Sequence, residues 1–433
     1  MTNNRGKKNP AASANPDVPE NGGKALLLAI LAALVLRIAY IWIFRTYHFA
    51  GKEKYLFGFE TGAIARSIAS GHGFSSPFHS LSGPSAWLAP LYPCFVASVF
   101  KICGIYSDRS AFVILSFNSA LSSLTCLPLY LLCRRLSGVN VPQARAHRIA
   151  LAASWVWALA PPAMFWAVTW VWETAASALL LTWLLWLTLT LAASAGIRRW
   201  LLFGFGWSIA ALTNPSLLSF LPVSLAYPLW VRRSRGQPWL SRALIVLLLF
   251  LNAITPWLLR NYEVFHYPVF IRPNLWAEVS FGNAPGADGT WLARIHPSGN
   301  AAEEASYNLM GEVQYVQWKK LQVVEFIRGN PGFFARLCTS RVYLFWSGYL
   351  SHDERLRWLR ASGWIMFSLL AAAGVFFLFR TKTRGAVPVA LLLLIYPLPY
   401  YVTFAFARYK HPIEPLMTAL AAHAVACLVR RSN

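Results

Sequence analysis

The sequence predicts a polytopic α-helical membrane protein, and three features of the chain lead to this prediction. Apolar side chains make up 57% of the 433 residues and charged side chains only 13%, a composition outside the range of soluble domains. The apolar residues form runs long enough to cross a bilayer as helices. The basic residues stand mostly in small groups between these runs, as in cytoplasmic loops. The net charge of +23 therefore reflects membrane topology, and nucleic acid is not an expected partner.

The apolar runs predict about ten transmembrane helices, most of them close to the length that the hydrocarbon core of a bilayer requires. The predicted spans cover residues 25–44, 110–133, 149–168, 174–193, 200–212, 217–231, 243–259, 362–379, 387–406 and 413–429. The segment before them, residues 1–24, is rich in Asn, Pro, Ala, Gly and Lys, which predicts a disordered cytoplasmic tail. Arg37 lies inside the first span, where a charge is costly, so we expect it to face the protein interior or to reach the membrane interface.

The basic residues assign the connections to the two sides of the membrane. Arginine groups follow the second, fourth, sixth, eighth and tenth spans, and the positive-inside rule places these connections in the cytoplasm. The outer turn 169–173 and the break 213–216 contain neither Lys nor Arg. We therefore expect a multi-pass protein of the cell inner (plasma) membrane with both termini in the cytoplasm.

Two regions interrupt the apolar pattern on the predicted outer side. The first is the loop 46–109, inside a transmembrane catalytic core of residues 25–259. The second covers residues 260–361, which contain Gly, Pro, Asn and most of the acidic residues and predict a small extracytoplasmic domain of mixed structure. Residues 362–433 complete the chain with the C-terminal membrane helices.

The first outer loop carries the residues around which the prediction of function is built. Its segment 60–93 reads ETGAIARSIASGHGFSSPFHSLSGPSAWLAPLYP, with one carboxylate, two histidines and an arginine. Apolar residues at helical spacing follow Glu60, and Gly71 ends the pattern, which predicts a short helix with Glu60 in its first turn. Glu173 provides a second carboxylate on the next outer turn.

Carboxylates and arginines on the outer face suit a transfer reaction whose donor is anchored in lipid. A sugar linked through phosphate to a polyprenyl chain already has a fair leaving group, but cations must take up the charge that the phosphate gains. The acceptor hydroxyl is a poor nucleophile and needs a positioned base, which contributes about 10²- to 10⁴-fold in rate. A single displacement of this kind inverts the anomeric centre.

Four stretches carry a resemblance to a known family. They are ETGAIARSIASGHGFSSPF followed by GPSAWLAPLYP in the first loop, PWLLRNYEVFHYPVFIRPN from Pro256, FGNAPGADGTW from Phe281, and RYKHPIEP from Arg408. Together with the topology, they resemble membrane glycosyltransferases of the GT-C superfamily, in the branch of the dolichyl-phosphate-mannose-protein mannosyltransferases and the aminoarabinose transferases of lipid A (glycosyltransferase family 39).

The resemblance implies a glycosyltransferase for a hexose or pentose that takes its sugar from a polyprenyl phosphate at the outer leaflet, as in the synthesis of cell-envelope glycans. The acidic residue of the first loop, which the family uses as a base, corresponds to Glu60, and the second carboxylate corresponds to Glu173. This sequence has Glu60 where the family commonly has Asp, and it lacks the paired Asp-Glu of the protein mannosyltransferases. The acceptor therefore stays open among glycan, lipid and protein.

Each residue has an alternative structural role. Glu60 is either the base or a helix N-terminal acid, and Glu173 is either a second acid of the site or a helix cap. Arginine at the outer end of a span either anchors the interface or grips a lipid phosphate. The isolated loop histidines either bind substrate or make ordinary hydrogen bonds. The predicted substrate-binding residues are Arg260, Arg272, Arg408, Lys410, His411 and His79.

Several classes of function are excluded or less favoured. The sequence has no DxD triad for a nucleotide-sugar metal and no P-loop, and the displacement needs neither a metal nor a cofactor, so we expect none. A transporter or flippase for lipid-linked sugars is the alternative from another class, although no inverted repeat is evident. A ligase or polymerase that uses a pyrophosphate-linked donor is the alternative among enzymes.

Overall fold

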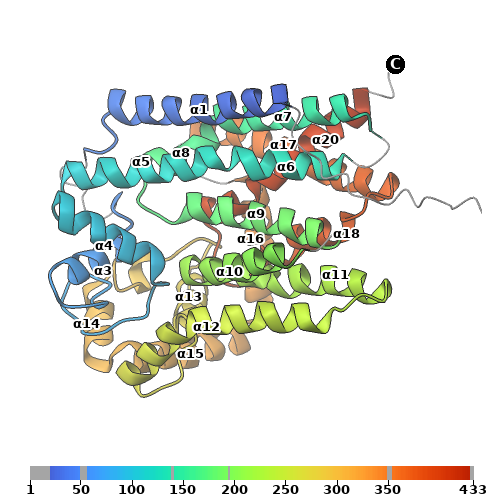
Figure 1. Cartoon of the computed structure of the whole chain (residues 1–433). Helices are drawn as coiled ribbons and strands as arrows, with labels where there is room; N and C mark the ends of the chain where they lie inside the picture. The colour runs from blue at the N-terminus through green and yellow to red at the C-terminus, as the bar shows by residue number, and fades with distance from the viewer. Residues whose placement is uncertain (1–19, 49–55, 138–140, 194–195, 349–353, 430–433) are drawn as a thin grey trace, which may run out of the picture.

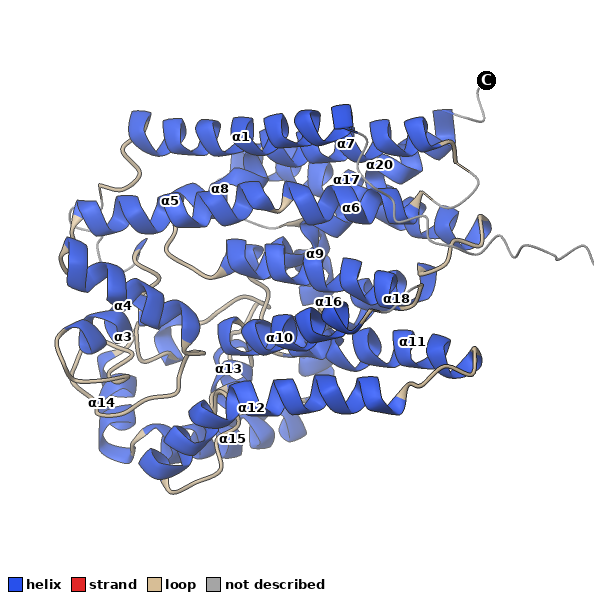
Figure 2. Ribbon diagram, in the orientation of Figure 1, coloured by secondary structure: helices blue, strands red, loops and turns tan. Residues whose placement is uncertain are grey.

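The computed structural model describes residues 20–48, 56–137, 141–193, 196–348 and 354–429. Figure 2 shows helices and loops throughout this part of the chain, with no strand. Pairing between extended segments is limited there to one isolated β-bridge between Ser75 and Pro84. Most of the predicted cytoplasmic tail, residues 1–19, lies outside the described residues, and residues 20–24 belong to the first helix.

The helices form a bundle with a helical cap at one end (Figure 1). The bundle helices are α1 (Glu20–Ile43), α5 (Asp108–Leu124), α6 (Cys126–Leu136), α7 (Gln143–Leu159), α8 (Pro161–Thr169), α9 (Thr174–Leu191), α10 (Ile197–Thr213), α11 (Leu221–Ser234), α12 (Leu240–Phe265), α17 (Glu354–Arg380), α18 (Ala386–Ile395) and α20 (Glu414–Val429). The shorter elements and the helices of the cap are α3 (Glu60–Ala69), α4 (Leu91–Cys103), η1 (Pro215–Phe220), α13 (Leu275–Gly282), η2 (Ala293–Ile295), α14 (Ala301–Met310), α15 (Glu312–Gly329), α16 (Pro331–Ser347), α19 (Leu398–Val402) and η3 (Ala407–Ile413).

The chain is a multi-pass membrane protein. Within the described ranges, six helical stretches are long and apolar enough to cross a bilayer. They cover Gly22–Ile43, Asp108–Leu136, Thr174–Leu191, Leu240–Phe265, Leu359–Arg380 and Ala407–Val429. The pair α7 and α8 is long enough for a seventh but bends by 46°, where Ala160 takes an extended conformation before Pro161. The other predicted spans correspond to the shorter helices α10, α11 and α18, so ten crossings remain a prediction.

The segments assigned to the cytoplasm lie at one end of the bundle. The Arg135 guanidinium, at the end of α6, donates a hydrogen bond to the carbonyl of Leu189 near the end of α9. Arg235, after α11, donates to the carbonyl of Ala192, also at the end of α9. Cations at these positions complement the negative ends of helix dipoles. Figure 1 shows α3, α4 and α14 at the opposite end of the bundle.

Arg37 is buried in the bundle. Of the two positions expected for it, the protein interior and the membrane interface, the structure shows the first. Its guanidinium donates hydrogen bonds to the Ser122 hydroxyl and to the carbonyls of Ala33, Trp157 and Ala158. These partners lie on α1, α5 and α7, so the arginine joins three helices and has a packing role.

Residues 260–361, predicted to have mixed structure, contain only helices and loops in their described part. The helix α12 continues beyond Leu259 to Phe265, and α13 to α16 follow as helices. The first outer loop is also more ordered than predicted. It contains the expected helix α3, which begins at Glu60, and an unpredicted apolar helix, α4.

Candidate active site

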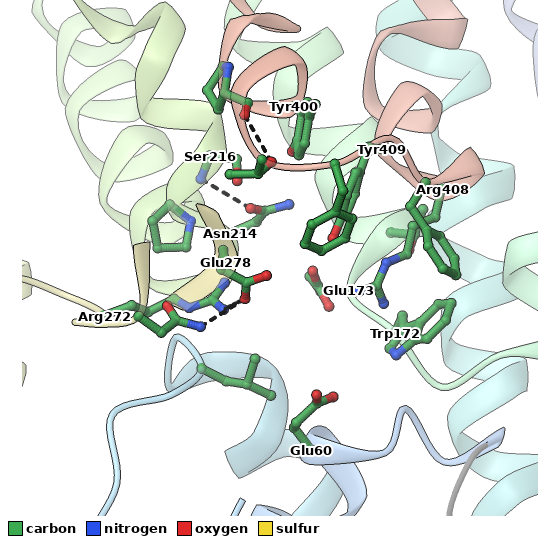
Figure 3. Close-up of a pocket in the computed structure, with 18 of the residues that line it drawn as sticks. Glu60, Trp172, Glu173, Asn214, Ser216, Arg272, Glu278, Tyr400, Arg408 and Tyr409 are labelled. Atoms are coloured by element: carbon green, nitrogen blue, oxygen red, sulfur yellow. Dashed lines mark hydrogen bonds and ion pairs between the residues drawn. The ribbon is translucent and has the colours of Figure 1, made fainter. Parts of the chain in front are cut away.

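The cap and the adjoining ends of the bundle enclose a cavity of about 520 Å³. Five segments assigned to the outer face contribute to its wall: Glu60 on α3, Glu173 before α9, Asn214 before η1, Arg272 before α13 and Arg408 on η3. Figure 3 shows these five side chains around one space. Residues far apart in the chain therefore form a single polar site inside an otherwise apolar protein.

The loop before Glu60 packs against the turn that carries Glu173. The Val171 amide donates a hydrogen bond of 3.1 Å to the Leu56 carbonyl. Gly58 has a φ of 73°, and its Cα lies so close to Val171 that a Cβ would overlap the Val171 carbonyl oxygen. Glycine adopts this left-handed conformation without steric cost. The contact sets the position of the two carboxylates relative to each other.

Glu60 faces the cavity and retains only 22% of its side-chain exposure. Burial raises the pKa of Glu60 from 4.5 to about 7, and the Glu278 carboxylate acts in the same direction. The cations Arg408 and Arg272 oppose this rise. A carboxyl that titrates near neutral pH is well placed to accept a proton in catalysis.

Glu173 occupies the N-cap position of α9, but its side chain makes no capping hydrogen bond. The capping role considered for this residue is therefore wrong. The carboxylate points into the cavity instead, between Glu60 and Tyr409 of η3 (Figure 3). The neighbouring Trp172 places its ring beneath Arg408, with the guanidinium carbon 3.8 Å from the ring centroid.

A third carboxylate, Glu278 on α13, lies on the other side of the cavity. Arg272 Nη2 approaches Glu278 Oε1 at 3.4 Å, and the Asn274 amide donates to the same oxygen at 2.9 Å. Arg272 Nε also donates to the Trp87 carbonyl at 2.7 Å, which joins this group to the first outer loop. Burial raises the pKa of Glu278, and Arg272 and Arg408 oppose the rise.

Two of the predicted substrate-binding residues, Arg260 and His79, pair with other segments instead of lining the cavity. Arg260 donates hydrogen bonds to the carbonyls of Ser85 and Phe74, because α12 extends past the predicted end of the span and directs this side chain at the loop. His79 contacts the Glu304 carboxylate of α14 at 2.9 Å.

Lys410 and His411 also lie outside the cavity wall, although Arg408 of the same segment lines it. The segment folds as η3, a 3₁₀-helix with three residues per turn, so Lys410, two residues after Arg408, points in another direction. Lys410 Nζ lies 3.6 Å from the centroid of the Trp364 ring. His411 Nδ1 contacts Glu414 Oε2 at 2.7 Å.

Several residues of the site were not singled out from the sequence. Tyr396, Tyr400 and Tyr409 form one wall, where the rings of Tyr400 and Tyr409 stack with centroids 4.3 Å apart. Glu278 could have been suspected, because it is the one carboxylate in the apolar stretch LWAEVSFG. His296, whose Nε2 lies 3.6 Å from Glu60 Oε1, gave no such signal in a loop of ordinary composition.

Comparison with one solved structure supports the fold. The apo structure of the Archaeoglobus fulgidus oligosaccharyltransferase matches 95% of this chain at a TM-score of 0.54 and 13% sequence identity. A second structure, that of the oligosaccharyltransferase AglB from the same organism with an inhibitory peptide and a dolichol-phosphate, covers 95% of the chain at a TM-score of 0.48 and 12% identity. This chain spans about half, 51%, of the length of each.

No protein-family model matches the chain, and no curated protein matches it by sequence. The apo oligosaccharyltransferase is a GT-C-type enzyme, so the GT-C fold expected from the sequence motifs is confirmed. At this level of identity the likeness concerns the arrangement of the helices alone.

Proposed function

We propose that the protein is a membrane glycosyltransferase that moves a sugar from a polyprenyl phosphate to an acceptor hydroxyl. The observation that carries the proposal is the convergence of the Glu60, Glu173 and Glu278 carboxylates with Arg272 and Arg408 in one cavity. A base for the acceptor and cations for the leaving phosphate are the groups that this displacement requires. The GT-C fold adds support by analogy.

In the proposed mechanism, Glu60 accepts the proton of the acceptor hydroxyl. The oxygen attacks the anomeric carbon as the bond from that carbon to the phosphate oxygen breaks, and the polyprenyl phosphate leaves with the bonding electrons. Attack from the side opposite the phosphate inverts the anomeric centre. Glu173 lines the same cavity. Its carboxylate accepts hydrogen bonds from hydroxyl groups of the sugar or the acceptor and so orients that substrate.

The leaving phosphate is assigned to Arg408 and Arg272. The guanidinium of Arg408 lies over Trp172, which holds the planar group in one orientation, and arginine can contact a phosphate through two parallel hydrogen bonds. Arg272 is oriented by Glu278 and by the Trp87 carbonyl. Both cations counter the charge that develops on the phosphate.

We further propose that the cavity faces the extracytoplasmic side of the inner membrane, with both termini in the cytoplasm. The basic ends of the helices lie at the opposite end of the bundle from the cavity, as seen for Arg135 and Arg235. The positive-inside rule then directs the cavity outward. In this orientation the donor reaches the site from the outer leaflet, and the helices α13 to α16 form an extracytoplasmic cap.

The proposal is tested by turnover of a radiolabelled polyprenyl-phosphate sugar in proteoliposomes. We expect Glu60→Gln to lower the rate by about 10²- to 10⁴-fold, and Glu325→Gln, which changes an exposed carboxylate on α15, to retain the wild-type rate. A Glu60→Gln rate above about a tenth of wild type would remove the residue from the role of base.

The product distinguishes the proposal from its alternatives. Release of a lipid monophosphate with an inverted glycoside supports it. Release of a lipid pyrophosphate indicates a ligase or polymerase. Movement of the intact donor between leaflets without a new glycosidic bond indicates a flippase.

A further inference from the structure

We propose that His296 is a positioning residue for Glu60, a neutral imidazole that presents its Nε2–H to the carboxylate. The inference concerns the same site and takes its catalytic meaning from the proposed function. Its physical basis is the contact itself: Nε2 of His296 lies 3.6 Å from Oε1 of Glu60. This separation slightly exceeds a hydrogen bond, and a small rotation of the flexible glutamate side chain closes it.

The hydrogen bonds of the other ring nitrogen place the proton on Nε2. His296 Nδ1 accepts a hydrogen bond of 3.0 Å from the backbone N–H of Ser298, a group that can only donate. The Ser298 hydroxyl lies 2.6 Å from the same nitrogen and can donate to it as well. Nδ1 therefore carries no proton, and in the neutral ring the proton resides on Nε2, which faces Glu60.

The surroundings of His296 keep the ring neutral. The side chain is only 4% exposed and contacts the rings of Phe281, Trp291 and Phe78, with centroids 4.4, 5.2 and 5.6 Å away. Burial lowers the pKa of His296 to about 3, and Lys319 on α15 acts in the same direction. The ring does not exchange protons near neutral pH, so it acts as a fixed donor.

A fixed hydrogen-bond donor at this position favours the ionised form of the Glu60 carboxyl. The charged groups that act on Glu60 from neighbouring elements are Arg408 on η3, Arg272 before α13 and Glu278 on α13, and Glu173 shares the cavity. His296 differs from them because it has no net charge and places its Nε2 3.6 Å from the carboxylate oxygen. A hydrogen bond to the ionised form favours that form, so the imidazole holds one oxygen while the other stays available to the acceptor hydroxyl.

Infrared difference spectroscopy of the purified protein in nanodiscs tests the inference without a donor. The carboxyl band of Glu60 is followed against pH, with Glu60→Gln as the reference that identifies it. We expect His296→Leu to raise the midpoint of the Glu60 titration by about one pH unit, the effect of one lost hydrogen bond to a charged acceptor. His296→Gln, whose amide N–H reaches the same place, should shift it by less than half as much.

Two results would overturn the inference: an unchanged midpoint in His296→Leu, or equal shifts in the Leu and Gln variants. If His296→Leu does not fold, ¹⁵N spectra of histidine-labelled wild-type protein decide, with His296→Gln assigning the signal. A neutral Nε2–H ring near pH 6 supports the inference, and an Nδ1–H or charged ring refutes it. Because neither measurement needs turnover, a failed transferase assay and a failed His296 test remain separate outcomes.

Discussion

Gly58 and Val171 are in direct contact between their main chains, and this contact joins the loop that carries Glu60 to the turn that carries Glu173. The two segments are separated by the helices α3 to α8, yet the space between them has no room for a Cβ atom on residue 58. The geometry of the proposed site therefore depends on Gly58, a residue without a side chain.

Gly58→Ala is expected to reduce both stability and turnover. The φ of 73° alone costs an alanine about 1 to 2 kcal/mol, and the overlap with Val171 must in addition displace the loop and Glu60. Gly71→Ala is the matched control, because Gly71 has a φ of 86° with nothing within 4 Å of the added Cβ. Thermal unfolding should detect both changes, whereas kcat/KM should fall at least about tenfold more in Gly58→Ala. Equal kcat/KM values would show that the contact does not position the base.

The pH dependence of the reaction should follow Glu60. Because burial raises the pKa of this carboxyl to about 7, the ionised base and kcat/KM increase as pH rises through that value and level off above it. Stability has the opposite sign. Between pH 4.5 and about pH 7 the folded protein binds more protons at Glu60 than the unfolded chain does. The contribution of the protonated Glu60 to the free energy of unfolding is therefore lost as pH rises through this range. Melting temperatures in detergent across this range should fall less in Glu60→Gln than in wild type; parallel curves would contradict the raised pKa.

Arg408→Ala should weaken binding of the donor more than binding of the acceptor. Loss of a charge-assisted contact to phosphate is expected to raise the KM for the polyprenyl-phosphate sugar about 10- to 100-fold. Arg408→Lys keeps the charge but loses the planar stacking on Trp172. Its KM for the donor should therefore lie between those of the wild type and Arg408→Ala. Initial rates measured with each substrate varied in turn provide the test, and a larger effect on the acceptor KM would reassign the residue.

Arg341→Ala should destabilise the cap, although Arg341 does not line the cavity. The side chain is fully buried on α16 and donates to the Asn283 amide oxygen and to the carbonyls of Gly282 and Val402. It thus joins α13, which carries Glu278, to the end of α19. Removal takes the arginine's hydrogen bonds away from buried acceptors and should cost about 3 kcal/mol of unfolding free energy.

The comparison for this substitution is Arg336→Ala on the exposed face of the same helix, where a change within about 0.5 kcal/mol is expected. Denaturant unfolding in detergent measures both. Similar losses for the two variants would show that the buried hydrogen bonds of Arg341 do not hold the cap together.

The main part of the helical framework could be predicted because its signal is local. Runs of apolar residues predicted the multi-pass architecture, and the start of α3 at Glu60 followed from apolar spacing and Gly71. The alternation of basic and uncharged connections also predicted that Glu60, Glu173 and Arg408 would share one end of the bundle. All three line the cavity.

The remaining site residues depended on contacts between distant segments. Arg260 and Arg272 were both predicted to bind the phosphate, but the extra turn of α12 directs Arg260 to the carbonyls of the first loop. Lys410 follows Arg408 by two residues, and the 3₁₀ geometry of η3 turns it away. Neither helix length nor turn type can be read from side-chain chemistry.

Composition and local spacing in the chain specify which segments are apolar enough to enter the membrane, which connections share a face, and which acid begins α3. These properties follow from composition and spacing within a few turns of chain. The packing of the cap places Glu278 and His296 beside Glu60, and it keeps Arg260, His79, Lys410 and His411 out of the cavity wall. A side chain's partner in this cap depends on how loops and short helices pack. Their polar, aperiodic sequences specify that packing through contacts far apart in the chain.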